Sequence, residues 1–139
     1  MNEIIVGIDG SETAEIAAQK AAALASECGR PLHVVMAIKK HTSTQFSTGG
    51  SDTWQVDSLA EAEQSLASII STLRLEAEVT SVVVVDDPAA ALCSEAERTG
   101  ASIIVVGNRR VKGISRVLGA VATDVARQAP CDVLIAYTT

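Results

Sequence analysis

The segment around residues 107–119 contains the residue types that bind a small anion. Three glycines recur six positions apart, at Gly107, Gly113 and Gly119, and glycine lets backbone N–H groups approach phosphate oxygens closely. A helix is expected to begin near Gly119, and the N-terminus of a helix favours negative charge. This segment contains four basic residues within a span of eight positions: Arg109, Arg110, Lys112 and Arg116. The combination predicts an anion site, with a solvated basic loop as the alternative.

The charge of the whole chain makes this basic segment stand out. The formal net charge is −6, yet residues 101–123 contain four basic and no acidic residues, so the remainder carries −10 (−6 − 4). A protein that binds duplex DNA is usually basic, and single-strand binding relies on exposed aromatic residues, which make up only 2% of this chain. We therefore expect no nucleic-acid partner and a small anionic ligand instead.

A carboxylate follows the first apolar run of the chain. Asp9 comes directly after Ile8, and ligands of open parallel sheets bind outside the carboxyl ends of the strands, where the strand order reverses. A carboxylate there can accept hydrogen bonds from a ribose hydroxyl or an adenine amino group. Asp9 can equally cap the helix that follows, and its position in the sequence favours neither role.

The sequence contains no recognisable catalytic set. The P-loop pattern, a GxGxxG after the first strand and a GxSxG turn are all absent. His33 and His41 have neither metal-ligand spacing nor an obvious serine or cysteine partner. Asp86 and Asp87 stand just before an expected helix, where capping explains two carboxylates better than acid–base chemistry does. We therefore predict no efficient catalysis and no metal site.

Short apolar runs alternate with helical segments along the 139 residues. The predicted strands are residues 4–8, 32–38, 79–85, 103–106 and 133–136. Each run is nearly continuous in apolar residues, which is typical of strands buried on both faces of a parallel sheet. The predicted helices follow Ser11, carry an apolar stripe from Leu59 to Leu73, follow Asp87, and run from about Gly119 to Ala129. Strict alternation predicts one doubly wound α/β domain over residues 1–139, with helices on both faces of the sheet.

Finer expectations concern packing and one loop. In the last helix Val121 and Val125 should face inward, and the first helix should bury a stripe that ends at Cys28. Residues 39–53 are rich in Ser, Thr and Gly and indicate an irregular loop, either a lid or a tolerated surface segment.

The cysteines bear on the cellular compartment. Cys28, Cys93 and Cys131 are odd in number, far apart and in apolar surroundings, which predicts small buried thiols in a reducing compartment. No signal-peptide pattern precedes the first strand, and no apolar stretch approaches the roughly 20 residues of a membrane span. We therefore expect a cytoplasmic protein with no membrane partner.

Essentially the whole chain resembles the universal stress protein family. The similar segments are residues 4–11, 31–35, 87–89, 101–109 and, most specifically, 118–121 with 129–135. The resemblance implies a five-stranded parallel sheet in the order 3-2-1-4-5, a homodimer, and in many members ATP bound without strong hydrolysis. The fifth strand would then be an edge, and residues 133–137 are apolar and free of proline and lysine. Such an edge invites pairing, so we predict a homodimer through the fifth strand.

The glycine motif departs from that of the family's nucleotide-binding members. Their pattern is Gly, two residues, Gly, nine residues, Gly, then Ser or Thr. Gly107 matches the first glycine, but Arg110 stands at the second, eight residues separate it from Gly119, and Ala120 replaces the hydroxyl residue. The lost hydroxyl would contribute about 1.5–3 kcal/mol if it bonded a charged oxygen. Arg110 either obstructs the loop or replaces a backbone contact with a charge-assisted one.

The resemblance implies an adenine nucleotide, ATP or AMP, as the ligand. By family position, Asp9 and Ala37 would face the base and ribose, and either Arg109 or Arg110 would reach the phosphates. The predicted nucleotide-binding residues are Ile8, Asp9, Ala37, Gly107, Asn108, Arg109, Arg110, Gly119, Ala120 and Val121.

Three functions follow from these observations. The first is a nucleotide-binding stress-response module without efficient catalysis. The second is a family member that has lost nucleotide binding and acts through dimerisation and contact with a protein partner. The third, an ATP hydrolase, would need a general base or metal site that the sequence does not present.

Overall fold

The computed structural model describes residues 2–9, 12–39, 50–74, 76–108 and 118–138. In that part of the chain, strands and helices alternate strictly. The strands are β1 (Ile4–Ile8), β2 (Leu32–Ile38), β3 (Val79–Val85), β4 (Ile103–Gly107) and β5 (Asp132–Ala136). The helices are α1 (Glu12–Cys28), α2 (Gly50–Thr72), α3 (Pro88–Thr99) and α4 (Ala120–Gln128). All neighbouring strands are parallel, in the order β3-β2-β1-β4-β5, which confirms the predicted fold class and strand order.

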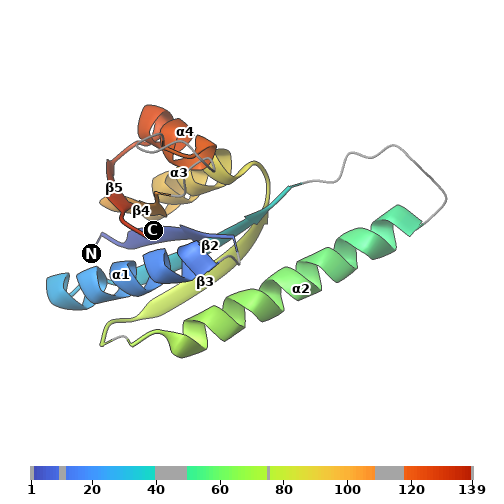
Figure 1. Cartoon of the computed structure of the whole chain (residues 1–139), viewed down its shortest axis with the longest axis horizontal. Helices are drawn as coiled ribbons and strands as arrows, with labels where there is room; N and C mark the ends of the chain where they lie inside the picture. The colour runs from blue at the N-terminus through green and yellow to red at the C-terminus, as the bar shows by residue number, and fades with distance from the viewer. Residues whose placement is uncertain (1, 10–11, 40–49, 75, 109–117, 139) are drawn as a thin grey trace.

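The sheet separates two hydrophobic layers, as Figure 1 shows. On one face α1 and α2 pack against side chains such as Val6 and Val34. On the other face α3 and α4 pack against side chains such as Ile5 and Ile104. The chain places β2 and β3 on one side of β1, and then β4 and β5 on the other side. Because crossover connections are right-handed, this reversal puts the helices of the two halves on opposite faces of the sheet. The predicted helices on both faces are therefore confirmed.

Alanine side chains make the contacts between α1 and the sheet. On α1 the fully or almost fully buried residues recur at helical spacing: Ala17, Ala18, Ala21, Ala22 and Ala25. Such small side chains let the helix backbone approach the sheet, while the branched side chains of the strands fill the space between them. This packing explains how a chain with 2% aromatic residues still forms a dense core.

The edge strands are less buried than the sequence pattern indicates. The central strands carry the fully buried side chains, but Thr80 and Ser81 of β3 are exposed, as are Leu134 and Ile135 of β5. An edge strand has a neighbour on one side only, and the helices do not cover it completely. The prediction of burial on both faces therefore holds for the middle of the sheet and is wrong for its edges.

Two helix ends agree with the sequence signals. Gly29 after α1 and Gly100 after α3 adopt φ values of 64° and 67°, in the left-handed region that glycine enters cheaply. Asp87 is the N-cap residue of α3 with Pro88 next, as predicted, but its side chain makes no capping bond. The Asp87 N–H instead donates to Asp86 Oδ1 at 2.7 Å. Ser11, the predicted cap of α1, lies outside the described residues.

The prediction of an irregular segment over residues 39–53 is wrong for its last part. Helix α2 already begins at Gly50, and in Figure 1 its first turns extend beyond the sheet. An apolar stripe marks the portion of a helix that packs, and residues 50–58, in which Trp54 and Val56 are the only large apolar residues, show no such stripe. Residues 40–49 lie outside the described part of the chain.

Two packing expectations are also wrong. Val125 is fully buried, but Val121 is 38% exposed, because Ala122 and Val125 form the inward face of α4. Cys28 is exposed at the last residue of α1, and Cys93 and Cys131 are only half-buried. A single helical step rotates a side chain by about 100°, so one position separates the buried from the exposed face.

Gly7 offers a test of the contact between β1 and α3. A Cβ atom at Gly7 would lie 2.8 Å from Leu92 Cδ1, well inside van der Waals contact. We expect Gly7→Ala to lower the free energy of unfolding by about 1 kcal/mol, because Leu92 must shift in a filled core. Denaturant unfolding of Gly7→Ala, Leu92→Ala and the double variant measures this. Strictly additive losses would show that the two side chains do not compete for space.

Candidate ligand-binding site

The predicted site residues come from strands that end at the same edge of the sheet. Val6 of β1 lies opposite Val105 of β4. Ile8 and Gly107 are the last residues of β1 and β4, two positions beyond this pair in each strand. The chain leaves β1 toward β2 on one side, and β4 lies on the other, so this is the point where the strand order reverses. Open α/β sheets bind ligands at such a point.

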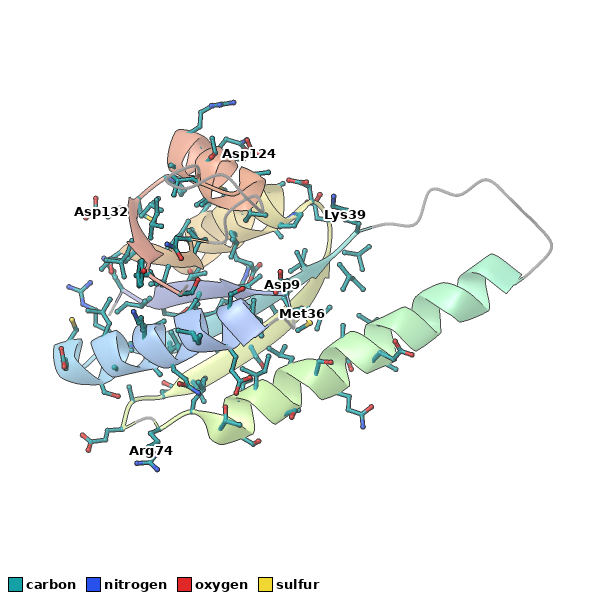
Figure 2. The ribbon with its side chains drawn as sticks, viewed as in Figure 1. Asp9, Met36, Lys39, Arg74, Asp124 and Asp132 are labelled. Carbon is teal, nitrogen blue, oxygen red and sulfur yellow. The ribbon has the colours of Figure 1, made fainter. Side chains whose placement is uncertain are left out.

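Three further predicted positions lie at the ends of these strands. Ala37 of β2 lies one residue beyond the Ile8–Met36 pair, and Asp9 and Asn108 are the residues directly after β1 and β4. Asp9 is exposed and Ala37 half-buried. Figure 2 shows Asp9 and Met36 close together at this end of the sheet. The structure therefore brings the predicted base-facing and ribose-facing residues together.

The first turn of α4 supplies backbone donors to the same edge. Gly119 is the N-cap residue with extended backbone angles (φ −65°, ψ 165°), and the first turn contains no acidic residue. The Gly119 carbonyl accepts hydrogen bonds from the N–H and the hydroxyl of Thr123, at 3.1 and 3.0 Å. A crossover helix runs antiparallel to its strands, so α4 begins at their carboxyl ends. The first N–H groups at Ala120 and Val121 have no partner within the helix and can bind an anion.

Asn108 has a different environment from the other predicted residues. It is buried, and its Oδ1 accepts hydrogen bonds from the Thr138 N–H at 2.8 Å and the Thr138 hydroxyl at 2.9 Å. Its own N–H donates to the Ala136 carbonyl at 3.0 Å. The side-chain oxygen of Asn108 thus faces the residues after β5. Sequence reasoning missed Thr138 altogether.

The basic residues of the prediction are not part of the described structure. Arg109 and Arg110 lie outside the described residues, as do Lys112, Gly113 and Arg116. Their proposed contacts with phosphate remain predictions from the sequence.

A second polar cluster lies at the opposite, amino-terminal end of the sheet. His33 on β2 is buried, and its ring nitrogens lie 2.7 Å from Thr80 Oγ1 and 2.8 Å from Glu95 Oε1. Arg98 donates two hydrogen bonds to the same carboxylate, at 2.8 and 3.1 Å. The Arg98 hydrogen bond lowers the pKa of Glu95 against the opposing effect of burial, and the His33 bond lowers it further. The sequence signal for this cluster was a histidine inside an apolar run, because a buried imidazole needs hydrogen-bond partners.

The described residues present no activated nucleophile or metal cluster. Burial raises the pKa of the Cys93 and Cys131 thiols, with a further increase from Cys131 and Glu97 at Cys93 and from Asp132 at Cys131. A raised pKa makes a thiol less nucleophilic. No group of three His, Cys, Asp or Glu residues in this part of the chain could hold a metal ion. None of its helices is both long enough and apolar enough to span a membrane.

These features define a class of protein. A parallel sheet in this strand order, with helices on both faces, is a doubly wound α/β fold. Residues 1–136 match the model of the universal stress protein family. The chain therefore belongs to that family, as the resemblance indicated.

Solved structures agree with this assignment. A universal stress protein in complex with cAMP is 25% identical, with 99% of this chain and 98% of that one covered and a TM-score of 0.67. UspA from Lactobacillus plantarum is 19% identical, with 96% of each chain covered and a TM-score of 0.78. The universal stress protein of Archaeoglobus fulgidus in complex with dAMP is 23% identical, with 97% of each chain covered and a TM-score of 0.63. The last two support the fold alone. No curated protein matches the sequence.

Proposed function

We propose that this universal stress protein binds an adenine nucleotide and acts as a stress-response module without efficient catalysis. The observation that carries the proposal is the placement of Asp9, Ala37 and Asn108 at the carboxyl ends of β1, β2 and β4, where the strand order reverses. The first turn of α4, which begins at this edge, contains no acidic residue. The family member that is 25% identical over nearly its full length is a complex with cAMP, which supports the same ligand class here.

The roles follow from the chemistry of each position. The Asp9 carboxylate would accept hydrogen bonds from the base or ribose, and the small Ala37 would leave room for the ring. The phosphates would meet the N–H groups at Gly119, Ala120 and Val121, because a helix N-terminus has no competing partner for them. Arg109 or Arg110 would add charge-assisted bonds. Since Gly119 and Ala120 have no side-chain donor, we expect weaker binding than in members with an intact motif.

Calorimetry with AMP, ATP and cAMP tests this proposal. We expect heat of binding for the wild type and about tenfold weaker affinity for Asp9→Asn, because a charged acceptor contributes about 1.5–3 kcal/mol. Asp132→Asn is the matched control, since Asp132 begins β5 at the other end of the sheet and is well separated from Asp9 in Figure 2. Absence of heat with all three nucleotides at millimolar concentration would refute nucleotide binding and leave partner contact as the function.

Arg110→Gly decides between the two roles of Arg110. If the arginine obstructs the loop, the variant should bind ATP more tightly than the wild type. If it holds phosphate, the variant should bind more weakly, and added salt should weaken the wild type as well.

The absence of efficient catalysis is part of the proposal. It rests on the lack of a nucleophile–base pair in the sequence and on the raised pKa of the half-buried thiols. We expect ATP turnover well below about 1 per second, the low end of ordinary enzymes. Trace hydrolysis is compatible with the proposal, whereas steady turnover at that rate would assign the protein to the hydrolases.

A second candidate function is self-association and contact with a protein partner, and the β5 edge favours it. Leu134 and Ile135 are exposed, and Tyr137, just after the strand, is 61% exposed. Among the described residues, β5 pairs only with β4, so its outer edge retains free backbone groups. A homodimer through β5 would bury them.

We further propose a cytoplasmic location. Cys28, Cys93 and Cys131 are all free, which suits a reducing compartment. Recovery of the protein with a disulfide from its native cells would contradict this location.

A further inference from the structure

Thr138, which follows β5, is hydrogen-bonded to Asn108, the residue directly after β4. The side chain and backbone N–H of Thr138 both donate to Asn108 Oδ1, at 2.9 and 2.8 Å. Both residues are only 6% exposed, so these are buried bonds between segments 30 positions apart. The Asn108 N–H donates to Ala136, which completes three hydrogen bonds between Asn108 and residues 136–138. The direction in which the chain leaves β4 is therefore set by β5 and the residues that follow it.

Thr138 also packs against Gly107. A Cβ atom built on Gly107 would lie 3.4 Å from Thr138 Cγ2 and 3.5 Å from Thr138 Oγ1. The side chain of Thr138 thus packs against Gly107, the last residue of β4, and is hydrogen-bonded to Asn108, the residue after it. Gly107 faces Ala17 of α1 on the same side, at 3.7 Å from the built Cβ.

A contact with α1 holds the same residues from another direction. Lys20 Nζ donates to the Tyr137 carbonyl at 2.6 Å and lies 5.8 Å from the centre of the Tyr137 ring. An exposed contact of this kind adds little stability by itself. Together with the buried bonds, it keeps residues 137–138 beside the end of β4.

We infer that Thr138 is a positioning residue for the nucleotide site. Its hydroxyl holds Asn108, and through Asn108 it holds the backbone of Gly107 in the orientation that receives the ligand. The inference rests on the proposed nucleotide binding. A site whose backbone is already ordered loses less conformational freedom on binding, so its ligand affinity is higher. Without the hydroxyl, Asn108 keeps one of two bonds to its oxygen and gains freedom to turn.

The test compares Thr138→Val with Thr138→Ser by calorimetry with ATP and AMP. Valine keeps the shape and the backbone N–H bond but removes the hydroxyl, and we expect about tenfold weaker binding. Serine restores the hydroxyl and should bind within about twofold of the wild type. Thr99→Val is the matched control, because the Thr99 hydroxyl donates to the Glu95 carbonyl at 2.8 Å, in α3 and away from the site. It should leave affinity unchanged whatever it does to the melting temperature.

Hydrogen exchange on the ligand-free proteins separates positioning from general destabilisation. In Thr138→Val the Asn108 amide should exchange faster than in the wild type, while amides of β2 keep their protection. If the wild type binds nucleotide and Thr138→Val binds equally well, the positioning role is wrong and the proposed function stands. If the wild type binds none of the nucleotides, the proposed function fails and the positioning role fails with it.

Discussion

Leu134→Lys should weaken the proposed self-association of this protein through β5 by at least about 100-fold. Leu134 is 43% exposed on an edge strand whose outer backbone groups have no partner among the described residues. In a symmetric dimer each interface contains the substituted residue twice, so two apolar contacts are lost and two ammonium groups are desolvated. A loss of about 2.7 kcal/mol corresponds to 100-fold in the dissociation constant, and burial of one leucine alone contributes about 1.5–3 kcal/mol.

The opposite edge of the sheet provides the control. Val85 of β3 is 49% exposed, also on an edge strand, but the other exposed side chains of that strand, Thr80 and Ser81, are polar. Val85→Lys should therefore leave the dimer intact. Sedimentation velocity from nanomolar to micromolar concentration measures both variants. A wild type that is monomeric throughout, or Leu134→Lys with unchanged mass, would show that β5 is not the dimer interface.

The second large effect is expected at Glu95. Glu95→Ala should lower the free energy of unfolding near neutral pH by about 1–3 kcal/mol, because it leaves the buried His33 Nε2–H without its acceptor. A carboxylate can only accept, so the hydrogen of this bond belongs to the imidazole. Glu95→Gln should cost less, since its amide oxygen can still accept from His33. Glu97→Ala, an exposed position on the same helix, is the control and should change stability by less than about 0.5 kcal/mol.

The effect of Glu95 should depend on pH with a defined sign. Arg98 first, and then His33, lower the pKa of Glu95 in the folded protein. A lowered pKa means that the folded state binds the proton more weakly than the unfolded state does. The stabilisation is therefore complete above the unfolded value of a glutamate, about 4.3, and is lost as pH falls through the folded value. Urea unfolding from pH 7 to 3 should show the gap between wild type and Glu95→Gln closing in acid. A gap that stays constant would contradict the role of the charge.

The local elements could be predicted from the sequence because their signals are local. The predicted strands at residues 4–8, 32–38 and 79–85 coincide with β1, β2 and β3, since short apolar runs rich in β-branched residues favour buried strands. Gly29 and Gly100 mark helix ends because glycine alone enters the left-handed region cheaply. The start of α2 at Gly50 was missed, since residues 50–58 are mostly polar and show no apolar stripe at helical spacing.

The candidate site could be placed in part for the same reason. Asp9 and Gly107 follow apolar runs directly, and parallel strands bring their carboxyl ends to one edge. The strand order was not contained in the periodicity of the residues; the family resemblance supplied it, and the structure confirms it. Burial of the edge strands was overestimated, because an apolar run does not say whether a strand has one neighbour or two.

Only the tertiary structure decided which polar side chains meet. His33 bonds Thr80 and Glu95, which lie 47 and 62 positions further along the chain, and Asn108 bonds Thr138, 30 positions away. No local pattern predicts such pairs, because each residue is of a common type for its own segment. The pair forms only when the strand register and the crossover connections bring the two side chains together. The sequence by itself determined most of the strands and helices and which polar residues stand at the strand ends. The folded chain determined how residues 107 and 108 are held there, since buried polar groups take whichever partners the packing brings within reach.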